Sequence, residues 1–366
     1  MNATDRQSTF SGTKEVAERL RFDVGRLEAY MRDQAKGFAG PLTVSQFKGG
    51  QSNPTYLLET PARRYVLRRK PPGKLLPSAH AVDREYRVIA ALYPQGFPVP
   101  EPVLYCADES VVGTAFFVMS HVEGRVIWEP RMPASNPAER AKVYDAMNAT
   151  LARLHSFEPA AIGLADYGRA ENYVGRQVER WSKQYRASET QSIEAMDNLI
   201  EWLPKNIPPE AATTVVHGDY RLDNTIFHPT EPRILAVLDW ELSTLGDPLA
   251  DFAYHCMSWH IPPGQFRGIA GLDLDALGIP PEEVYVRNYC KRTGRGAIDP
   301  SHWDFYLAYN LFRIAAILQG IMKRVVDGTA ASAHARDAGM RARPMAELGW
   351  KMAQKLDGGK SFGRAA

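Results

Sequence analysis

The chain contains 366 residues, and 45% of them are hydrophobic, which is enough for a buried core in each of two or three lobes. Lys and Arg number 44 and Asp and Glu number 42, so the net charge is +2 and a dedicated nucleic-acid binder is not expected. The three cysteines are far apart and form no CxxC pair. Neither a disulfide framework nor a structural zinc site is therefore expected, and a reducing cytoplasm fits this composition.

No export or membrane segment is expected. Residues 1–12 are polar and lack the apolar stretch of a secretory signal. The most apolar run, residues 311–322, is interrupted by Arg313, Gln319 and Gly320, and it is shorter than a membrane span requires. The sequence thus predicts a cytoplasmic protein without a membrane partner, and it specifies no oligomeric state.

A polar leader, residues 1–22, precedes an expected short helix over Asp23–Gln34, with Asp23 as its N-cap. The pattern then changes to short strands separated by turns, interrupted by one amphipathic helix over Ser78–Tyr93. The expected strands are Leu42–Lys48, Thr55–Glu59, Tyr65–Arg68, Val103–Cys106 and Ala115–Met119. The first third of the chain is therefore expected to form a small sheet.

From Pro137 onward the apolar residues mostly recur with helical spacing. The expected helices are Pro137–Phe157, Tyr173–Tyr185, Ile193–Leu203, Pro248–Trp259, Glu282–Arg292, His302–Lys323 and Met345–Leu356. One strand-rich island, Thr214–Leu238, interrupts them. We therefore expect an α+β, bilobal protein, with a small antiparallel-sheet N-lobe over residues 23–121 and a larger, mainly helical C-lobe over residues 122–366. A cleft between two such lobes is a favoured place for a ligand.

The strand-rich island and its end carry an unusual set of oxygen-bearing side chains. Asp219 follows a short apolar strand, Asn224 comes five residues later, and Asp239 ends the next apolar run. ATP-dependent phosphoryl transfer needs one carboxylate to take the proton of a hydroxyl, and an amide oxygen and a second carboxylate to hold the Mg²⁺ on the phosphates. Asp and Asn also form ordinary turns, so a structural hairpin is the alternative for each residue taken singly. The ordered set favours the chemistry.

The motif from His217 to Asn224, together with the one from Leu238 to Glu241, resembles the aminoglycoside phosphotransferase and choline kinase family, which is related to protein kinases. The resemblance extends from about residue 42 to about residue 254 and implies a protein-kinase-like fold. It further implies that Asp219 is the catalytic base, that Asn224 and Asp239 are magnesium ligands, and that ATP is the phosphoryl donor.

A second stretch, Gly246–Ala253, matches a family segment whose second Asp braces the catalytic loop. In this chain that residue is Asp251, for which a buried structural role inside a helix is expected. Asp247 is expected to cap the helix that begins at Pro248. His155, at the end of another family-like stretch, is expected to be a packed or capping residue rather than a catalyst.

The first third should supply the nucleotide clamp. Gly49 and Gly50 lie between two expected strands, where glycines let backbone amides approach phosphates, and Ser52 and Asn53 would add polar contacts. An ordinary Gly-Gly hairpin is the alternative. The segment Met119, Ser120, His121 and Val122 would cross between the lobes and present backbone groups to the adenine edge, or else it is only a core strand with an exit turn.

The resemblance places a basic residue at the end of the strand Tyr65–Arg68, against the nucleotide phosphates, with Glu85 of the next helix as its ion partner. Protein kinases have Lys at this position, whereas this chain has Arg68, and Lys70 lies two residues further on. Arg binds phosphate well through two parallel hydrogen bonds, so we expect activity to be retained. The alternative is a solvated basic face formed by Arg63, Arg64, Arg68, Arg69 and Lys70.

The acceptor is expected to be a hydroxyl on a small molecule. From residue 321 onward nine basic residues oppose four acidic ones, which favours an anionic partner over a polycationic aminoglycoside. The segments Tyr65–Gly73 and Leu238–Pro248 resemble the kinase-like domains fused to acyl-CoA dehydrogenases and their free-standing bacterial relatives. That resemblance implies a hydroxyacyl-CoA acceptor. Aminoglycoside, choline and homoserine are the alternatives.

Three other classes remain open to different degrees. A non-catalytic nucleotide-binding pseudokinase is favoured by Arg68 and by the absence of Asp-Phe-Gly at Asp239, but Asp219, Asn224 and Asp239 are all present. A metallophosphoesterase needs a dense set of His and Asp, and the nine His are dispersed. A protein kinase would need an Ala-Pro-Glu segment after Asp239, and none follows.

Overall fold

The computed structural model describes residues 11–48, 53–73, 80–210, 212–330 and 334–361, with side chains described as far as residue 356. The chain divides into two compact units. The first unit comprises Met1–Glu129, Ile162–Leu164 and Leu222–Ser243, and the second comprises Pro130–Ala161, Ala165–Arg221 and Thr244–Ala366. The lobe boundaries expected from the sequence, near residues 22 and 121, remain predictions, because compactness also groups 222–243 with the first unit.

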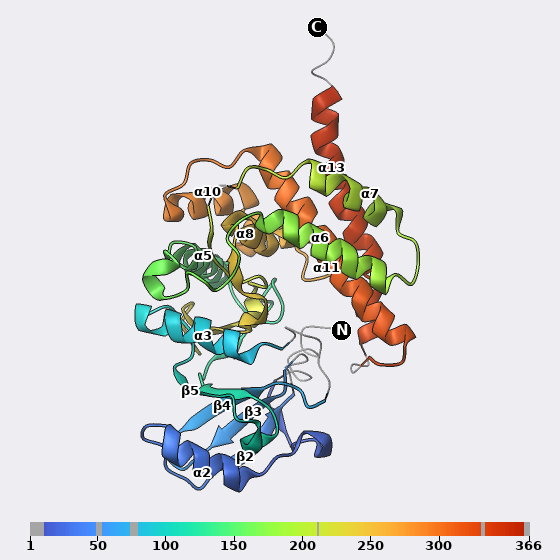
Figure 1. Ribbon diagram of the computed structural model, residues 1–366. Coiled ribbons are helices and arrows are strands. Elements are labelled where there is room, and N and C mark those ends of the chain that lie inside the picture. Colours follow the sequence, from blue (N-terminus) through green and yellow to red (C-terminus); the bar gives the residue numbers. More distant parts are fainter. Residues whose placement is uncertain (1–10, 49–52, 74–79, 211, 331–333, 362–366) are drawn as a thin grey trace. The chain divides into compact units, whose positions relative to one another are not determined.

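The first unit is built on an antiparallel sheet with the strand order β1-β2-β3-β4-β6-β5. The strands are β1 (Thr13–Lys14), β2 (Thr43–Phe47), β3 (Thr55–Glu59), β4 (Arg64–Arg69), β5 (Pro102–Cys106) and β6 (Phe116–Ser120). β4 lies in the middle of the sheet, and Arg68 is in register with Thr55 of β3 and Phe117 of β6. The antiparallel-sheet lobe expected from the sequence is therefore present (Figure 1).

The two faces of this sheet carry different helices, as Figure 1 shows. On one face α2 (Val24–Gln34) and α4 (Glu109–Val112) close an apolar core that includes Phe116 and Val118 of β6. Because successive strand residues point to opposite faces, Phe117 faces the other way, where its ring lies 6.1 Å from that of Tyr86 in α3 (Val82–Leu92). The expected N-cap of α2 is confirmed by the bond from the Arg26 N–H to Asp23 Oδ1.

A second, three-stranded sheet in the first unit has the order β10-β9-β7. Its strands are β7 (Arg125–Val126), β9 (Thr225–Phe227) and β10 (Ile234–Val237). The 3₁₀ turn η5 (Leu222–Asn224) leads into β9, and β10 leads to a second 3₁₀ turn, η6 (Trp240–Leu242). The hairpin thus brings residue 238 beside Asn224, whose carbonyl accepts the Leu238 N–H at 2.8 Å.

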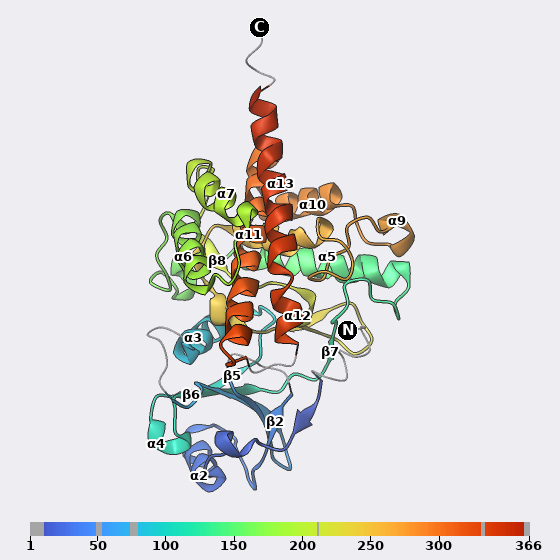
Figure 2. The same ribbon diagram turned by 90° about the vertical axis from the view of Figure 1, so that its right-hand side faces the viewer.

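The second unit is mainly helical, as expected. Its longer helices are α5 (Pro137–Leu154), α6 (Tyr173–Ser188), α7 (Glu194–Trp202), α8 (Pro248–Cys256), α10 (Glu282–Thr293), α11 (Pro300–Val326) and α13 (Ala342–Ser361). α11 packs against α6, α8, the short helix α12 (Ala335–Gly339) and α13, and Figure 2 shows α13 beside it. The strands β8 (Thr214–Val216) and β11 (Thr244–Gly246) form a two-stranded antiparallel ribbon. In the sequence β8 precedes, and β11 follows, residues 222–243, which belong to the first unit.

Among the described residues, one helix is long and apolar enough by length and composition to cross a membrane. This helix is α11, and 83% of its most apolar window is buried inside the protein. The interruptions noted in the sequence have structural partners here: Arg313 donates to the Gly218 carbonyl and Gln319 to the Ser188 carbonyl. α11 is therefore the central packing element of the second unit.

Candidate active site

Arg68 is the centre of a charged cluster in the first unit. Its Nη2 lies 2.8 Å from Asp239 Oδ1 and 3.3 Å from Glu241 Oε2. Its Nε lies 3.1 Å from Glu85 Oε2, an ion pair without hydrogen-bond geometry. The expected ion pair between Arg68 and Glu85 is thus present. Asp239 and Glu241, which follow β10, add two further carboxylates to the cluster.

Burial and charge compete in this cluster. Burial opposes the charged form of Arg68, but Glu85, Asp239 and Glu241 outweigh it and raise the pKa of the guanidinium. Burial raises the pKa of the Glu85 carboxyl to about 7; Arg68 and a hydrogen bond from Asn53 oppose the shift, while the two neighbouring anions add to it. Glu85 therefore titrates near neutral pH, whereas Arg68 stays charged.

The alternative of a solvated basic face is wrong for Arg68 and Arg69. Only 11% of the Arg68 side chain is exposed, and Arg69 is buried on the opposite face of β4. Arg69 donates to the Tyr56 hydroxyl and to the carbonyls of Val112 and Leu20. The two neighbouring arginines differ because alternate strand residues point to opposite faces. Lys70 is half-buried. That Arg68, rather than Lys70, contacts the phosphates stays a prediction.

Asn53 is fully buried beside this cluster. Its Nδ2 donates to Glu85 Oε1 at 2.9 Å, and its Oδ1 lies 2.8 Å from His80 Nδ1. Asn53 therefore braces the acid that pairs with Arg68, a contact the sequence did not predict. Gly49, Gly50 and Ser52, the other residues of the expected phosphate loop, lie outside the described residues, so their phosphate contacts remain predictions.

The expected adenine-reading segment continues from β6. Met119 is buried, and Ser120 is tied to Glu101 by two bonds, its N–H donating to the Glu101 carbonyl and its hydroxyl accepting the Glu101 N–H. The His121 N–H donates to the Arg64 carbonyl. Val122 follows and is half-buried. The segment is thus held firmly to the sheet, and its contact with a nucleotide remains a prediction.

The His121 ring has an aromatic neighbour. Phe47, the last residue of β2, lies parallel to it, with 6.4 Å between the ring centroids and 4° between the planes. Burial and the nearby Arg64 lower the pKa of His121, so the imidazole is neutral at pH 7. A neutral imidazole and a phenyl ring both present apolar faces suited to stacking on a nucleobase.

Asn224 and Asp239 come together through the β9–β10 hairpin. The Asn224 carbonyl accepts the N–H of Leu238, the residue before Asp239. Asp239 adopts the left-handed conformation, with φ 65° and ψ 61°, which Asp tolerates better than most residues. About a third of its side chain is exposed. An amide oxygen and a carboxylate are hard oxygen donors, so this pair fits the preference of Mg²⁺ for a few oxygen ligands plus water.

Asp219 belongs to the second unit, in the loop after β8. Its Oδ1 accepts a hydrogen bond of 2.5 Å from the Tyr254 hydroxyl, and its Oδ2 lies 3.1 Å from Arg221 Nη2. Its N–H donates to Nδ1 of His217. Gly218 has φ 82°, a conformation that a side chain would strain, so glycine allows the sharp turn that presents Asp219 after the strand.

Asp251 of α8 braces this loop, as the resemblance implied. Its two oxygens accept the backbone N–H groups of His217 at 2.7 Å and Gly218 at 2.8 Å, and His155 Nε2 lies 3.1 Å away. Burial alone would raise the pKa of Asp251, but the hydrogen bonds and charges of His155 and His217 outweigh it and lower the pKa. His155 is packed, as expected, with its other nitrogen 2.7 Å from the Tyr289 hydroxyl.

Asp247 caps α8 as expected. Its Oδ1 accepts the Leu249 N–H at 2.8 Å, and its Oδ2 accepts the Tyr306 hydroxyl at 2.5 Å. The cap fixes the start of the helix that carries Asp251 and Tyr254. The predicted residues therefore fall into two groups: Arg68, Glu85, Asn224 and Asp239 belong to the first unit, and Asp219 belongs to the second.

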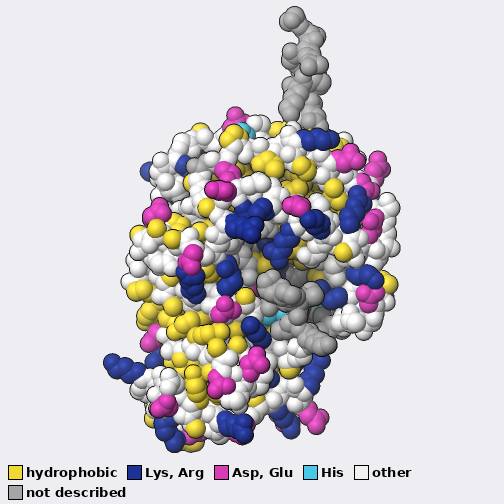
Figure 3. Space-filling view, viewed as in Figure 1, with side chains coloured by type: hydrophobic (Ala, Val, Ile, Leu, Met, Phe, Trp, Pro, Cys, Tyr) yellow, Lys and Arg dark blue, Asp and Glu magenta, His cyan; other side chains and the backbone are white. Residues whose placement is uncertain are grey.

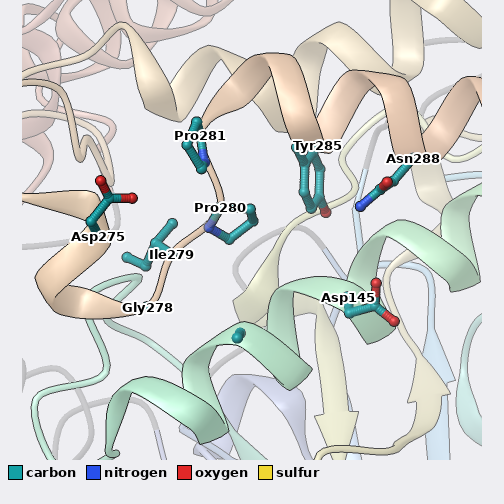
Figure 4. A pocket seen from close by; sticks show the side chains of 9 residues that line it. Asp145, Asp275, Gly278, Ile279, Pro280, Pro281, Tyr285 and Asn288 are labelled. Carbon is teal, nitrogen blue, oxygen red and sulfur yellow. The ribbon is translucent and has the colours of Figure 1, made fainter.

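An open pocket of about 320 Å³ lies elsewhere in the second unit (Figure 4). It is lined by α5, by α10, by the short helix α9 (Leu274–Leu277) and by the segment that joins α9 to α10. Asp145 of α5 and Asn288 of α10 lie on facing helices there. None of the predicted site residues lines this pocket.

On the face shown in Figure 3, acidic and basic side chains are interspersed.

Four residues near the predicted ones were given no site role from the sequence: Phe47, Arg221, Glu241 and Tyr254. Arg221 and Glu241 each lie two residues after a predicted carboxylate, so their spacing was a usable signal. Phe47 and Tyr254 lie 74 and 35 residues from their partners, and no local pattern connects them. Among the described residues, no three His, Cys, Asp or Glu side chains form a group that could hold a metal ion.

The first unit has an Arg–Glu ion pair between the central strand of its sheet and a helix. The second, helical unit has a buried Asp that braces a His-Gly-Asp loop. Together these features define a kinase-like phosphotransferase. A sequence model described as the phosphotransferase enzyme family matches residues 43–295. The chain belongs to this family.

A relative with a curated description is acyl-CoA dehydrogenase family member 10 of Mus musculus, 46% identical over 346 residues. The match covers 94% of this chain and 32% of the mouse protein, so the chain spans about a third of that relative's length. A solved structure from Ralstonia eutropha JMP134, named as a candidate aminoglycoside phosphotransferase, is 60% identical with a TM-score of 0.84, covering 92% of this chain and 99% of that one.

Two more distant structures share the fold. Choline kinase from Cryptosporidium parvum is 12% identical with a TM-score of 0.64, covering 92% of this chain and 97% of the other. A thermostable aminoglycoside phosphotransferase in a ternary complex with ADP and hygromycin B is 14% identical with a TM-score of 0.57, covering 89% and 97%. The protein-kinase-like fold expected from the sequence is confirmed.

Proposed function

We propose that this protein is an ATP- and Mg²⁺-dependent phosphotransferase that phosphorylates a hydroxyl group of a small molecule, with a hydroxyacyl-CoA as the preferred acceptor. The observation that carries the proposal is the Arg68 cluster. In it a nearly buried guanidinium pairs with Glu85 and with Asp239, the acid expected to bind the metal. A cation fixed beside a metal-binding carboxylate is suited to the charge of a nucleoside triphosphate.

The chain's own groups divide the work of the transfer. Arg68 binds phosphate oxygens, and Glu85 keeps its side chain oriented. Asp219 accepts the proton of the acceptor hydroxyl while the acceptor oxygen forms its new bond to the γ-phosphorus. The bond from that phosphorus to the bridging oxygen breaks, and ADP leaves with the electron pair. Mg²⁺, held by Asn224 and Asp239, supplies charge neutralisation on the phosphates when bound.

The acceptor proposal has two supports. A relative that shares 46% identity with this chain is named an acyl-CoA dehydrogenase family member, which associates the kinase-like part with acyl-CoA chemistry. The chain is also rich in basic residues from residue 321 onward, which suits the phosphates of CoA. A 4-hydroxyacyl thioester is the form we favour, because phosphorylation of its hydroxyl turns it into a group that can later be eliminated.

The experiment that tests the proposal is an acceptor panel. ADP release from ATP and Mg²⁺ is measured with 4-hydroxyacyl-CoAs, the same acyl-CoAs without the hydroxyl, an aminoglycoside, choline and homoserine. We expect stimulation only by the hydroxylated CoA esters, with a phosphoester in the product. Stimulation by another member of the panel would replace the acceptor, and nucleotide binding without any transfer would favour the pseudokinase alternative.

A further inference from the structure

The two oxygens of Asp219 have different partners. Oδ1 accepts the Tyr254 hydroxyl at 2.5 Å, and Oδ2 lies 3.1 Å from Arg221 Nη2. Only 16% of the Asp219 side chain is exposed, so water competes little for these contacts. A short hydrogen bond from a hydroxyl to a carboxylate is about twice as strong as one between neutral groups.

Tyr254 is itself held in place. It lies in α8 and is 3% exposed. The Arg313 guanidinium lies 5.0 Å from the centre of its ring, and Nη2 of the same arginine donates to the Gly218 carbonyl at 2.5 Å. Trp181 lies 5.6 Å from that guanidinium. One buried cation therefore contacts both the Tyr254 ring and the peptide group that precedes Asp219.

The phenol has a fixed protonation state. Burial and the adjacent Asp219 raise the pKa of Tyr254, so its hydroxyl stays protonated and donates throughout the neutral range. The charged and titratable groups that face Asp219 among the described residues of its unit include His217 and Arg221 of its own loop, Tyr254 of α8 and Arg313 of α11. Among them Tyr254 donates to Oδ1.

We propose that Tyr254 is a positioning residue, whose hydroxyl holds Oδ1 of Asp219 and so fixes the orientation of Oδ2, the oxygen beside Arg221 that accepts the proton of the acceptor hydroxyl. This inference rests on the proposed function, in which Asp219 is the base. Without the hydrogen bond the carboxylate can rotate about its Cβ–Cγ bond, and the base spends less time in the reactive orientation. General-base catalysis depends on this geometry first and on the pKa second.

The test is Tyr254→Phe, which removes the hydroxyl and keeps the ring beneath Arg313. With ATP, Mg²⁺ and a 4-hydroxyacyl-CoA, we expect kcat to fall about 10- to 100-fold and KM for ATP to stay within about twofold. The loss should be confined to kcat, because the nucleotide still binds while the carboxylate has lost the donor that orients it. Hydrolysis of ATP, in which water replaces the acceptor hydroxyl, serves as a second assay.

The matched control is Tyr306→Phe. Tyr306 also donates to a carboxylate at 2.5 Å, but its partner is Asp247, the N-cap of the same helix α8. Both substitutions remove one Tyr–Asp hydrogen bond, so both should lower the melting temperature. Only Tyr254→Phe should lower kcat per folded molecule, because a purely structural loss changes the amount of active enzyme and not the rate of each active molecule.

The outcomes separate the inference from the function on which it rests. If the wild-type protein shows no transfer to any acceptor and no ATP hydrolysis, the proposed function and this inference fail together. If wild-type turnover is present and Asp219→Asn abolishes it, but Tyr254→Phe matches Tyr306→Phe in kcat per folded molecule, only the inference is overturned. A fall in kcat per folded molecule with an unchanged KM for ATP, in Tyr254→Phe alone, supports it.

Discussion

Arg68 and Asp239 form a 2.8 Å ion pair although 171 positions separate them in the chain. The pair joins the central strand β4 to the turn that follows β10, and Glu85 of α3 completes it from the other side. One guanidinium thus organises the two carboxylates that the resemblance assigns to the nucleotide and to the metal. Because the Glu85 side chain is buried, loss of the arginine should lower the stability of the unit.

Replacing Arg68 by Met should lower both stability and nucleotide binding. Above pH 7, where Glu85 is ionised in the fold, the change leaves its carboxylate buried without its cation. Loss of one partner of a buried ion pair lowers the free energy of unfolding by about 3–5 kcal/mol. Urea unfolding measures this loss, and titration with ATP and Mg²⁺ measures binding. Arg68→Lys should recover part of the stability, because it keeps the charge but cannot reach three carboxylates at once.

Lys70→Met provides the comparison for Arg68→Met. Lys70 is half-buried two residues away, and its backbone pairs with Thr114 and Ala115. We expect this variant to bind ATP within about threefold of the wild type, a difference below 1 kcal/mol. If Lys70→Met loses nucleotide binding while Arg68→Met retains it, Lys70 is the phosphate contact and Arg68 is structural only.

Asp219→Asn should abolish phosphoryl transfer while ATP binding is kept. The amide preserves the size of the side chain and can still accept from Tyr254, but it cannot take the proton of the acceptor. Loss of a general base slows a reaction by about 10²- to 10⁴-fold. Rapid-quench assays with radiolabelled ATP measure the rate, and equilibrium dialysis measures nucleotide affinity. Transfer at an undiminished rate would show that another group is the base.

Asp251→Ala should destabilise the second unit and inactivate the protein together. Asp251 accepts two backbone N–H groups of the loop that carries Asp219, and both would be left buried without a partner. Each buried unsatisfied donor costs about 1–3 kcal/mol, so we expect a loss of about 3 kcal/mol in thermal or urea unfolding. Asp299→Asn is the control, because Asp299 caps α11 at the surface and touches no part of that loop.

The Asp251 effect should also depend on pH. The pKa of Asp251 is lowered in the folded protein, so its stabilising contribution is present above the ordinary pKa of an aspartate and is lost as the pH falls through the folded value. The wild type should therefore lose stability on acidification more steeply than Asp251→Ala. Equal slopes for the two proteins would mean that Asp251 is not ionised in the fold.

The longer elements could be predicted because their periodicity is sustained. Thr55–Glu59 forms a strand with the bounds expected, and the helix expected from Pro137 begins there, capped by Asn136. The ribbon strand Thr244–Gly246 was not predicted, because three residues are too few to show an alternating pattern. Its pairing with Thr214–Val216 depends on a contact across 30 positions that local sequence does not encode.

The candidate site was predictable only where residues are close in sequence or carry a family motif. Asp219, Asn224 and Asp239 follow a recognisable spacing, and the Arg68–Glu85 pair followed from the resemblance. Tyr254 and Glu241 were given no site role, since the bonds from Tyr254 to Asp219 and from Glu241 to Arg68 exist only after folding. The burial of Arg69 could not be predicted from composition, because it depends on the face of β4 to which the side chain points.

Glu85 should make the stability of the first unit depend on pH near neutrality. Burial raises the pKa of its carboxyl from an ordinary value near 4.5 to about 7 in the folded protein. Between these two pH values Glu85 is ionised in the unfolded chain but still protonated in the folded protein. The free energy of unfolding therefore falls as the pH rises from about 4.5 to about 7, and the Glu85 contribution changes little above pH 7. At about 1.4 kcal/mol per pKa unit, the contribution is about 3 kcal/mol at most.

Urea unfolding of the wild type, Glu85→Gln and Glu123→Gln between pH 4.5 and 8 measures this contribution. Gln cannot ionise, so the Glu85 variant should lose the decline between pH 4.5 and 7. Glu123 is exposed and pairs with Arg64 at the surface, so its variant should follow the wild type. A Glu85→Gln protein whose stability declines with pH as steeply as that of the wild type would show that Glu85 is ionised throughout, held so by Arg68.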